Sequence, residues 1–145
     1  MNRLYATDVA SFTRKYRFTG GRMRRVKLKY ATTENFTVEF VLTASIAAKD
    51  LGSQPKPVKL RFRITGVEEF RFQKRPTMRS GSVTEARIGW FQDRFFINLD
   101  AWGLLPGDVP KVHDYRASDT YVAGRDLYWE EVIPKPKPDA GGEKK

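Results

Sequence analysis

The chain contains 145 residues, of which 40% are hydrophobic and 13% aromatic, and its formal net charge is +10. This length and apolar content are typical of one folded domain and exclude a generally disordered chain. No apolar run approaches the ~18 residues of a membrane-spanning helix, so we expect no membrane partner. The sequence has no cysteine, which excludes disulfides and thiol chemistry and fits a cytoplasmic location.

The positive charge is concentrated near the amino end of the chain. Residues 14–29 contain eight basic residues and no acidic residue, whereas residues 30–133 contain fourteen of each. A segment with this charge favours a negatively charged partner.

Residues 5–17 predict a short helix that is capped by Thr7 or Asp8. Its apolar face would consist of Val9, Phe12 and Tyr16. A glycine-containing turn at residues 19–21 leads into a strand predicted over residues 22–30. One face of that strand would carry Arg24, Val26, Leu28 and Tyr30, and the other face Arg25, Lys27 and Lys29.

Two long runs of alternating apolar and polar residues predict half-buried strands in the middle of the chain. The first run covers residues 36–44 and the second covers residues 58–65. A connection at residues 45–57 has room for one helical turn, and two prolines that flank Lys56 indicate that the second strand begins at Val58. The alternation changes phase between residues 67 and 70, which predicts a β-bulge or a bend.

After a polar loop at residues 73–82, the sequence predicts a hairpin. Residues 83–91 and 95–99 flank a turn at residues 92–94, so their aromatic side chains would pair across the two strands. Phe91 and Phe96 fall on the face opposite their apolar neighbours. This pattern predicts either a second covering layer or a docking surface on that face.

The last part of the chain is less regular. Residues 101–118 are rich in glycine, proline and aspartate and predict a long loop. Residues 120–122 and 127–132 predict two short strands, separated by Gly124-Arg125-Asp126.

About seven short strands with turn signals between them place the chain in the mainly β class. We expect a single-domain antiparallel sandwich or strongly bent sheet with a short N-terminal helix. The domain would cover residues 1–133. Residues 134–145 combine proline, lysine and glycine and predict a flexible, disordered tail.

The residues that carry chemistry form no catalytic pattern. The single histidine, His113, precedes Asp114, but neighbours in an extended chain point in different directions, and no cysteine or elbow serine is present as a nucleophile. The aspartates do not match the spacing of a calcium loop, and turns account for them. We therefore expect a non-enzymatic protein with no metal and no cofactor.

The candidate partner-binding residues are cations. They are Arg14, Lys15, Arg17, Arg22, Arg24 and Arg25, with Lys59, Arg61 and Arg63 as extensions if their strand lies nearby. These charges would attract an acidic protein. RNA or DNA is the alternative partner, with the same cations on phosphates and with Tyr16, Phe18 and Tyr30 as stacking surfaces. A structural alternative is that acidic residues 100–131 neutralise the cations, or that the cations guard a sheet edge against aggregation.

The order of these segments resembles a known family. The run Phe18-Thr-Gly-Gly-Arg-Met-Arg-Arg-Val26, the run Val58-Lys-Leu-Arg-Phe-Arg-Ile-Thr-Gly-Val67-Glu-Glu-Phe70 and the later hairpin are similar to small bacterial β proteins of the immunity protein 50 type and their uncharacterised relatives. The resemblance implies a β fold and a protein that binds and neutralises a toxin without catalysis. A His-Asp pair expected before Val26 is replaced by Gly-Gly-Arg-Met-Arg-Arg, so no functional residue carries over. We accordingly expect a non-catalytic binding module for an acidic, toxin-like protein.

Overall fold

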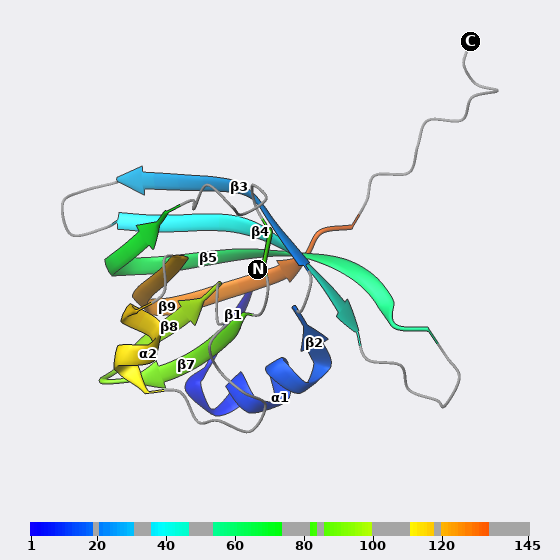
Figure 1. Ribbon diagram of the computed structural model, residues 1–145, viewed down its shortest axis with the longest axis horizontal. Coiled ribbons are helices and arrows are strands. Elements are labelled where there is room, and N and C mark those ends of the chain that lie inside the picture. Colours follow the sequence, from blue (N-terminus) through cyan, green and yellow to red (C-terminus); the bar gives the residue numbers. More distant parts are fainter. Residues whose placement is uncertain are drawn as a thin grey trace, which may run out of the picture.

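The computed structural model describes residues 1–18, 21–30, 36–46, 54–73, 82–83, 86–99, 111–117 and 120–133. Within these ranges, nine strands form one sheet (Figure 1). The long strands are β3 (Gly21–Tyr30), β4 (Phe36–Ile46), β5 (Lys56–Phe72) and β9 (Thr120–Glu131). The short strands are β1 (Asn2–Leu4), β2 (Tyr16–Arg17), β6 (Ser82–Val83), β7 (Arg87–Phe91) and β8 (Arg94–Asn98). The helices of the same ranges are the 3-10 helix η1 (Ala6–Asp8), α1 (Val9–Lys15) and α2 (Val112–Arg116).

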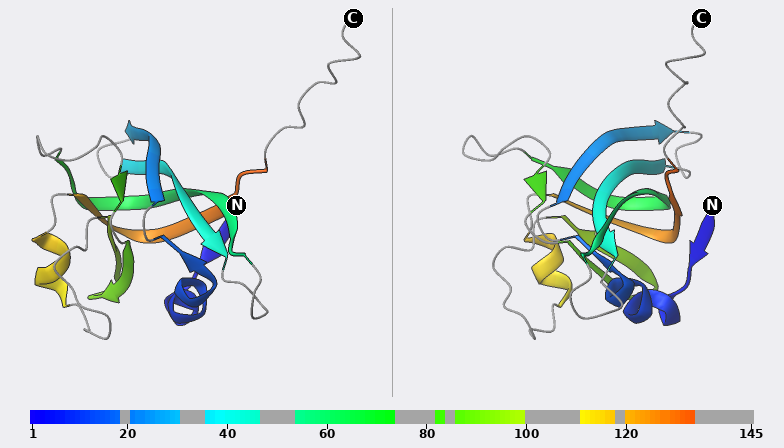
Figure 2. Two further views of the ribbon diagram at one scale, coloured as in Figure 1. Left: turned by 45° about the vertical axis from the view of Figure 1, so that its right-hand side comes forward. Right: turned by 90° about the vertical axis from the view of Figure 1, so that its right-hand side faces the viewer.

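The strand order across the sheet is β6-β3-β4-β5-β9-β8-β7, and neighbouring strands of the described ranges are antiparallel. Two short strands complete it: β2 pairs with the end of β4, and β1 pairs with β9 next to β8. Figure 2 shows the long strands curving around the side on which α1 lies. The prediction of a mainly β, antiparallel and strongly bent sheet with a short N-terminal helix is confirmed.

The alternating residues of β4 and β5 build the core on the concave side of the sheet. The buried members are Phe36, Val38, Phe40, Leu42 and Ala44 from β4, and Leu60, Phe62 and Ile64 from β5. Helix α1, with Asp8 as its N-cap residue, covers this side. Its Phe12 ring lies 6.0 Å from the ring of Phe62 and 5.0 Å from that of Trp129, measured between centroids. The predicted periodicity of both strands is therefore confirmed, although β5 begins at Lys56 instead of Val58.

The phase change expected in β5 is confirmed as a register shift against β9 between Val67 and Glu69. Gly66, beside it, adopts a φ of 59°. The prediction of two strands separated at residues 124–126 is wrong, because β9 runs through Gly124 without a break. A Cβ at Gly124 would collide with the Ile64 side chain and would lie 2.9 Å from the Thr65 carbonyl oxygen. The role of Gly124 is therefore to permit the close approach of β5 and β9, and not to form a turn.

The strand predicted over residues 22–30 is present as β3, but its two faces differ from the prediction. None of its residues is buried, since the strand lies near the edge of the sheet. Its register with β4 shifts between Arg24 and Lys27, and Arg25 takes a φ of 55°. This bulge changes the alternation. Arg24 therefore lies on the same side of the sheet as Lys27 and Lys29, and not with Leu28 and Tyr30 as predicted.

The predicted hairpin is confirmed as β7 and β8. Its turn residues Gln92 and Asp93 have φ values of 52° and 60°, the positive values that a type I′ turn requires. The region predicted as a long loop contains α2, which supplies Tyr115. The Tyr115 ring lies 5.5 Å from Phe91 and 5.8 Å from Phe96, so α2 covers the aromatic residues on the outer side of the hairpin.

Several sequence predictions concern residues outside the described ranges. They are the turn at residues 19–20, the part of the 45–57 connection at residues 47–53, the loop at residues 74–81, the loop at residues 101–110 and the tail at residues 134–145. Among the helices that are described, none has the length and apolar character needed to cross a bilayer.

Candidate cationic binding face

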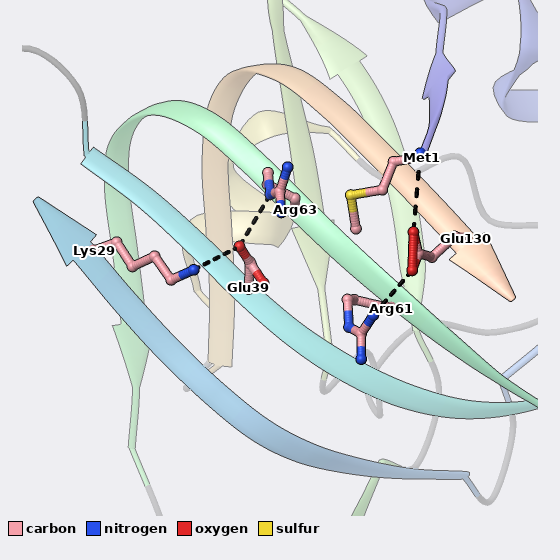
Figure 3. Close-up of polar contacts among 6 residues, drawn as sticks. All are labelled: Met1, Lys29, Glu39, Arg61, Arg63 and Glu130. Carbon is pink, nitrogen blue, oxygen red and sulfur yellow. Dashed lines mark hydrogen bonds and ion pairs between the residues drawn. The ribbon is translucent and has the colours of Figure 1, made fainter. Parts of the chain in front are cut away.

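The register of the strands determines which side chains point away from the core. Residues directly opposite each other in antiparallel strands share a face, and successive residues alternate between the two faces. Phe40 and Phe62 are paired and buried in the core. Their neighbours in sequence, which include Glu39 in β4 and Arg61 and Arg63 in β5, therefore point to the outer side of the sheet (Figure 3).

Four strands place cations on this outer side. Arg24, Lys27 and Lys29 of β3 lie opposite outward residues of β4, and alternation adds Arg22. Arg17 of β2 lies opposite Ser45, and Arg3 of β1 lies opposite Tyr128. We define the basic face as nine cations and three carboxylates: Arg3, Arg17, Arg22, Arg24, Lys27, Lys29, Lys59, Arg61, Arg63, Glu39, Asp126 and Glu130.

Glu39 is the buried acid of the basic face, and it is shared by two cations. The residue is 8% exposed, and its Oε2 accepts hydrogen bonds from Arg63 Nε at 3.0 Å and Lys29 Nζ at 3.2 Å (Figure 3). Burial alone would raise the pKa of the Glu39 carboxyl, but the hydrogen bonds from Arg63 and Lys29 lower it below its ordinary value of 4.5. Glu39 is thus a structural anion that fixes β3, β4 and β5 side by side.

The other two carboxylates of the face are also paired. Glu130 Oε2 accepts a hydrogen bond from Arg61 Nη1 at 2.9 Å, and Glu130 Oε1 lies 3.9 Å from the amino terminus of Met1 (Figure 3). Asp126 accepts a hydrogen bond from Arg3 at 2.8 Å. All three anions of the basic face are therefore occupied by Lys29, Arg63, Arg61, Arg3 and the amino terminus.

Five cations of the face remain without an ion pair to any described residue. They are Arg17, Arg22, Arg24, Lys27 and Lys59, and all five are exposed. Like charges this close repel one another, and only solvent and salt screen them. The face therefore has an excess of positive charge that a negatively charged surface would neutralise.

The structure brings six of the nine predicted site residues together: Arg17, Arg22, Arg24, Lys59, Arg61 and Arg63. Arg14 and Lys15 lie on α1 instead, where Lys15 Nζ sits 5.1 Å from the centroid of the Tyr16 ring. Arg25 occupies the β3 bulge. The basic face also contains Arg3, Lys27 and Lys29, which are not among the predicted site residues. The two lysines could have been included from their place in the same basic strand, whereas nothing in the sequence marks the pairing of Arg3.

The described acids of the last third of the chain neutralise only part of the predicted cationic surface. Glu130 pairs with Arg61, while Glu131 accepts a hydrogen bond from the Tyr16 hydroxyl at 3.0 Å. Burial, and then this contact with Glu131, raise the pKa of Tyr16 to about 12. His113 is exposed and lies 3.3 Å from Asp114 on α2, away from the basic face.

A second ionic cluster holds α2 and the hairpin to β5. Arg116 of α2 donates two hydrogen bonds to Glu69, at 2.9 and 2.8 Å, and Arg94 lies 2.6 Å from Glu68. The hydrogen bonds from Arg116 lower the pKa of Glu69, and those from Arg94 lower the pKa of Glu68. These carboxylates are satisfied by their own cations and are not counter-charges for the basic face.

Two shallow depressions lie along β1, with volumes of about 330 and 370 Å³. Lys15, Tyr16 and Trp129 line part of the larger one. Neither depression contains an unpaired cation of the basic face. Among the described residues, the unpaired cations therefore lie on the open surface of the sheet and not in either depression.

No family model, curated protein or solved structure matches the chain. The resemblance to immunity proteins stays a prediction.

The charge state of Glu39 should make the stability of the sheet depend on pH. Because the folded-state pKa of Glu39 lies below 4.5, its pairing stabilises the protein above about pH 4.5, and this contribution is lost as pH falls through the folded pKa. We expect Glu39→Gln to lower the free energy of unfolding by about 1 kcal/mol near neutral pH. The difference should shrink towards pH 3 in urea unfolding experiments. A difference that is constant across this pH range would contradict the assigned pairing.

Proposed function

We propose that the protein is a non-catalytic binding module that docks an acidic protein partner on the basic face. The observation that carries this proposal is the excess of five exposed cations, on one side of a continuous sheet, that form no ion pair with any residue of the described ranges. Strands in a sheet are ~4.8 Å apart, so these cations form an array instead of a single charge. Complementary charge on a partner would speed the encounter and select the partner.

The three aromatic residues considered for base stacking do not support a single-stranded nucleic acid as the partner. Stacking of bases needs exposed aromatic rings beside the cations. Tyr16 and Phe18 are only 1% and 3% exposed. Tyr30 is exposed but lies on the opposite side of the sheet, where it stacks on Phe36. The three residues considered for stacking are therefore not available on the basic face.

The resemblance to immunity proteins supplies the class of partner. We infer that the partner belongs to the toxin type and that binding blocks it without any chemical step by this chain. A cytoplasmic site of action is part of the proposal, and the cysteine-free sequence supports it.

The proposal is tested by fluorescence anisotropy with three labelled probes: polyglutamate, single-stranded RNA and duplex DNA, each of about 20 units. The variant Arg17→Gln/Lys59→Gln removes two unpaired cations of the basic face. Its matched control, Arg14→Gln/Lys15→Gln, removes two cations of α1. We expect polyglutamate to bind the protein in low salt and to weaken between about 50 and 200 mM salt, because charge pairing at a surface is screened.

The basic-face variant should lose about 10-fold or more in affinity for polyglutamate, and the α1 variant less than about 3-fold. Equal losses in both variants would show that only the overall charge matters and would contradict the proposed face. Tighter binding of either nucleic acid than of polyglutamate would replace the proposal with the nucleic-acid alternative.

A further inference from the structure

Strand β3 has a backbone edge that is almost unpaired. On one side it pairs with β4 along most of its length. On the other side, within the described residues, β6 pairs only with Gly21 and Arg22. The edge of β3 from residue 23 to residue 30 therefore has no strand partner in the described part of the chain. A strand edge of this kind presents N–H and C=O groups that can pair with another extended segment.

The two sides of β3 have different chemistry along this edge. Lys27 and Lys29 belong to the basic face, together with Arg24 before the bulge. Leu28 and Tyr30 point to the opposite side and are 48% and 73% exposed.

On the same side of the sheet as Leu28 and Tyr30, a row of aromatic rings extends from β3 across β4 to β5. The ring of Tyr30 stacks on that of Phe36 at 4.4 Å with an interplanar angle of 20°. Phe36 lies 5.1 Å from Phe70, which is 40% exposed, and Phe70 lies 6.0 Å from Phe72. Leu28 and Tyr30 lie at the outer end of this apolar side, so an apolar side chain on a strand added at the free edge of β3 would lie beside them.

We propose that β3 receives an extended segment of the acidic partner as an additional strand of the sheet. This inference rests on the proposed function and specifies how the partner binds. The segment would alternate acidic and apolar residues over about four to six positions, because successive side chains of a strand point to opposite faces. Its acids would lie beside Lys27 and Lys29, and its apolar side chains would lie beside Leu28 and Tyr30.

The charge of β3 favours an acidic segment at this edge over the β3 strand of a second copy of the chain. Pairing of two β3 edges would bring Arg24, Lys27 and Lys29 of each copy close to the same cations of the other, and like charges on adjacent strands destabilise a sheet. Cations and a bulge are features with which proteins protect an edge from unwanted pairing. The same cations would favour an acidic strand.

The test uses blocked hexapeptides bound to the full chain. The first alternates glutamate and valine. The second has the same composition in two blocks, so its charge is equal but its alternation is lost. The third alternates glutamate and valine with every backbone nitrogen methylated, which keeps the side chains and removes the N–H donors. We expect the alternating peptide to bind about 10-fold more tightly than either of the other two.

A pair of variants separates strand addition from attraction to the basic face. Leu28→Ser/Tyr30→Ser removes the exposed apolar side chains of β3 without changing charge. The matched control, Tyr5→Ser/Ile133→Ser, removes exposed apolar side chains elsewhere. The β3 variant should bind the alternating peptide about 10-fold more weakly while binding polyglutamate as the unmodified protein does, and the control should change neither.

Amide hydrogen exchange locates the peptide. Saturation with the alternating peptide should slow exchange at alternate amides between residues 24 and 30 by about 10-fold or more. Equal affinity for the three peptides, or unchanged exchange along β3, would overturn strand addition. If polyglutamate binding still depends on Arg17 and Lys59 in that case, the proposed function stands without this mode of binding.

Discussion

Replacing Phe62 by alanine is expected to lower the free energy of unfolding by about 3–5 kcal/mol. The Phe62 side chain is 1% exposed, and its ring lies within 6.1 Å of the rings of Phe12, Phe18 and Phe40. Alanine would leave a cavity where α1 meets β4 and β5. Denaturant unfolding followed by circular dichroism would measure the loss.

Two further variants serve as controls for the Phe62 prediction. Phe62→Leu retains much of the apolar volume and should cost clearly less than alanine. Lys59→Ala, on the outer side of the same strand, should change stability by no more than about 0.5 kcal/mol. A cost below about 1 kcal/mol for Phe62→Ala would mean that α1 does not pack on β5 as described.

Replacing Gly124 by valine should destabilise the fold by about 3 kcal/mol or more, at or beyond the upper end of the usual cost of overpacking. A side chain here meets Ile64, which can adjust, and the Thr65 carbonyl oxygen, which belongs to the backbone of β5 and cannot. The added atoms must therefore push β5 and β9 apart. Thermal or denaturant unfolding of the variant would measure the effect.

The same substitution at the next position is the matched control. Arg125 is exposed, and its contact with Glu68 is long, at 3.4 Å. Arg125→Val should therefore cost about 0.5 kcal/mol or less. Similar costs at both positions would indicate that β-branching or charge, and not the distance between the strands, determines the loss at Gly124.

The parts of the fold that follow from local periodicity were predictable. The alternation in β4 and β5 indicated which side chains enter the core, and the hairpin was recognisable from its two runs around residues 92–94. β1 has only three residues and shows no periodicity. Gly124 was interpreted as a turn, because a glycine that allows close strand packing looks the same in sequence as one that ends a strand.

The candidate site was predictable in part. The density of cations between residues 14 and 29 indicated a charged surface, but not which cations share a side. Arg14 and Lys15 do not lie on the basic face with the other predicted cations, because the chain is helical until Lys15 and extended from Tyr16. The bulge at Arg25 changes the side on which Arg24 lies, and no residue pattern marks it. Arg3 and its partner Asp126 in β9 are more than 120 residues apart in the sequence, so no local pattern indicates that they pair.

The curvature of the sheet explains why one side remains open to a partner. Apolar side chains of the concave side are covered by α1, and the outer side at β8 is covered by α2. Between these covered regions, the outer side of β3, β4 and the first half of β5 carries no helix of the described residues. Its cations therefore face solvent, while Glu39 and Glu130 hold the underlying strands in register.

Chemical-shift mapping with polyglutamate at low salt tests the basic face most directly. Two-dimensional ¹H–¹⁵N spectra of the protein would be recorded during the titration. If the partner binds the basic face, the largest changes will fall on the backbone amides of Arg17, Arg24 and Lys59 and on their outward neighbours in β3, β4 and β5. Largest changes at Arg14 and Lys15 of α1, or equal changes at all exposed cations, would contradict binding at this face.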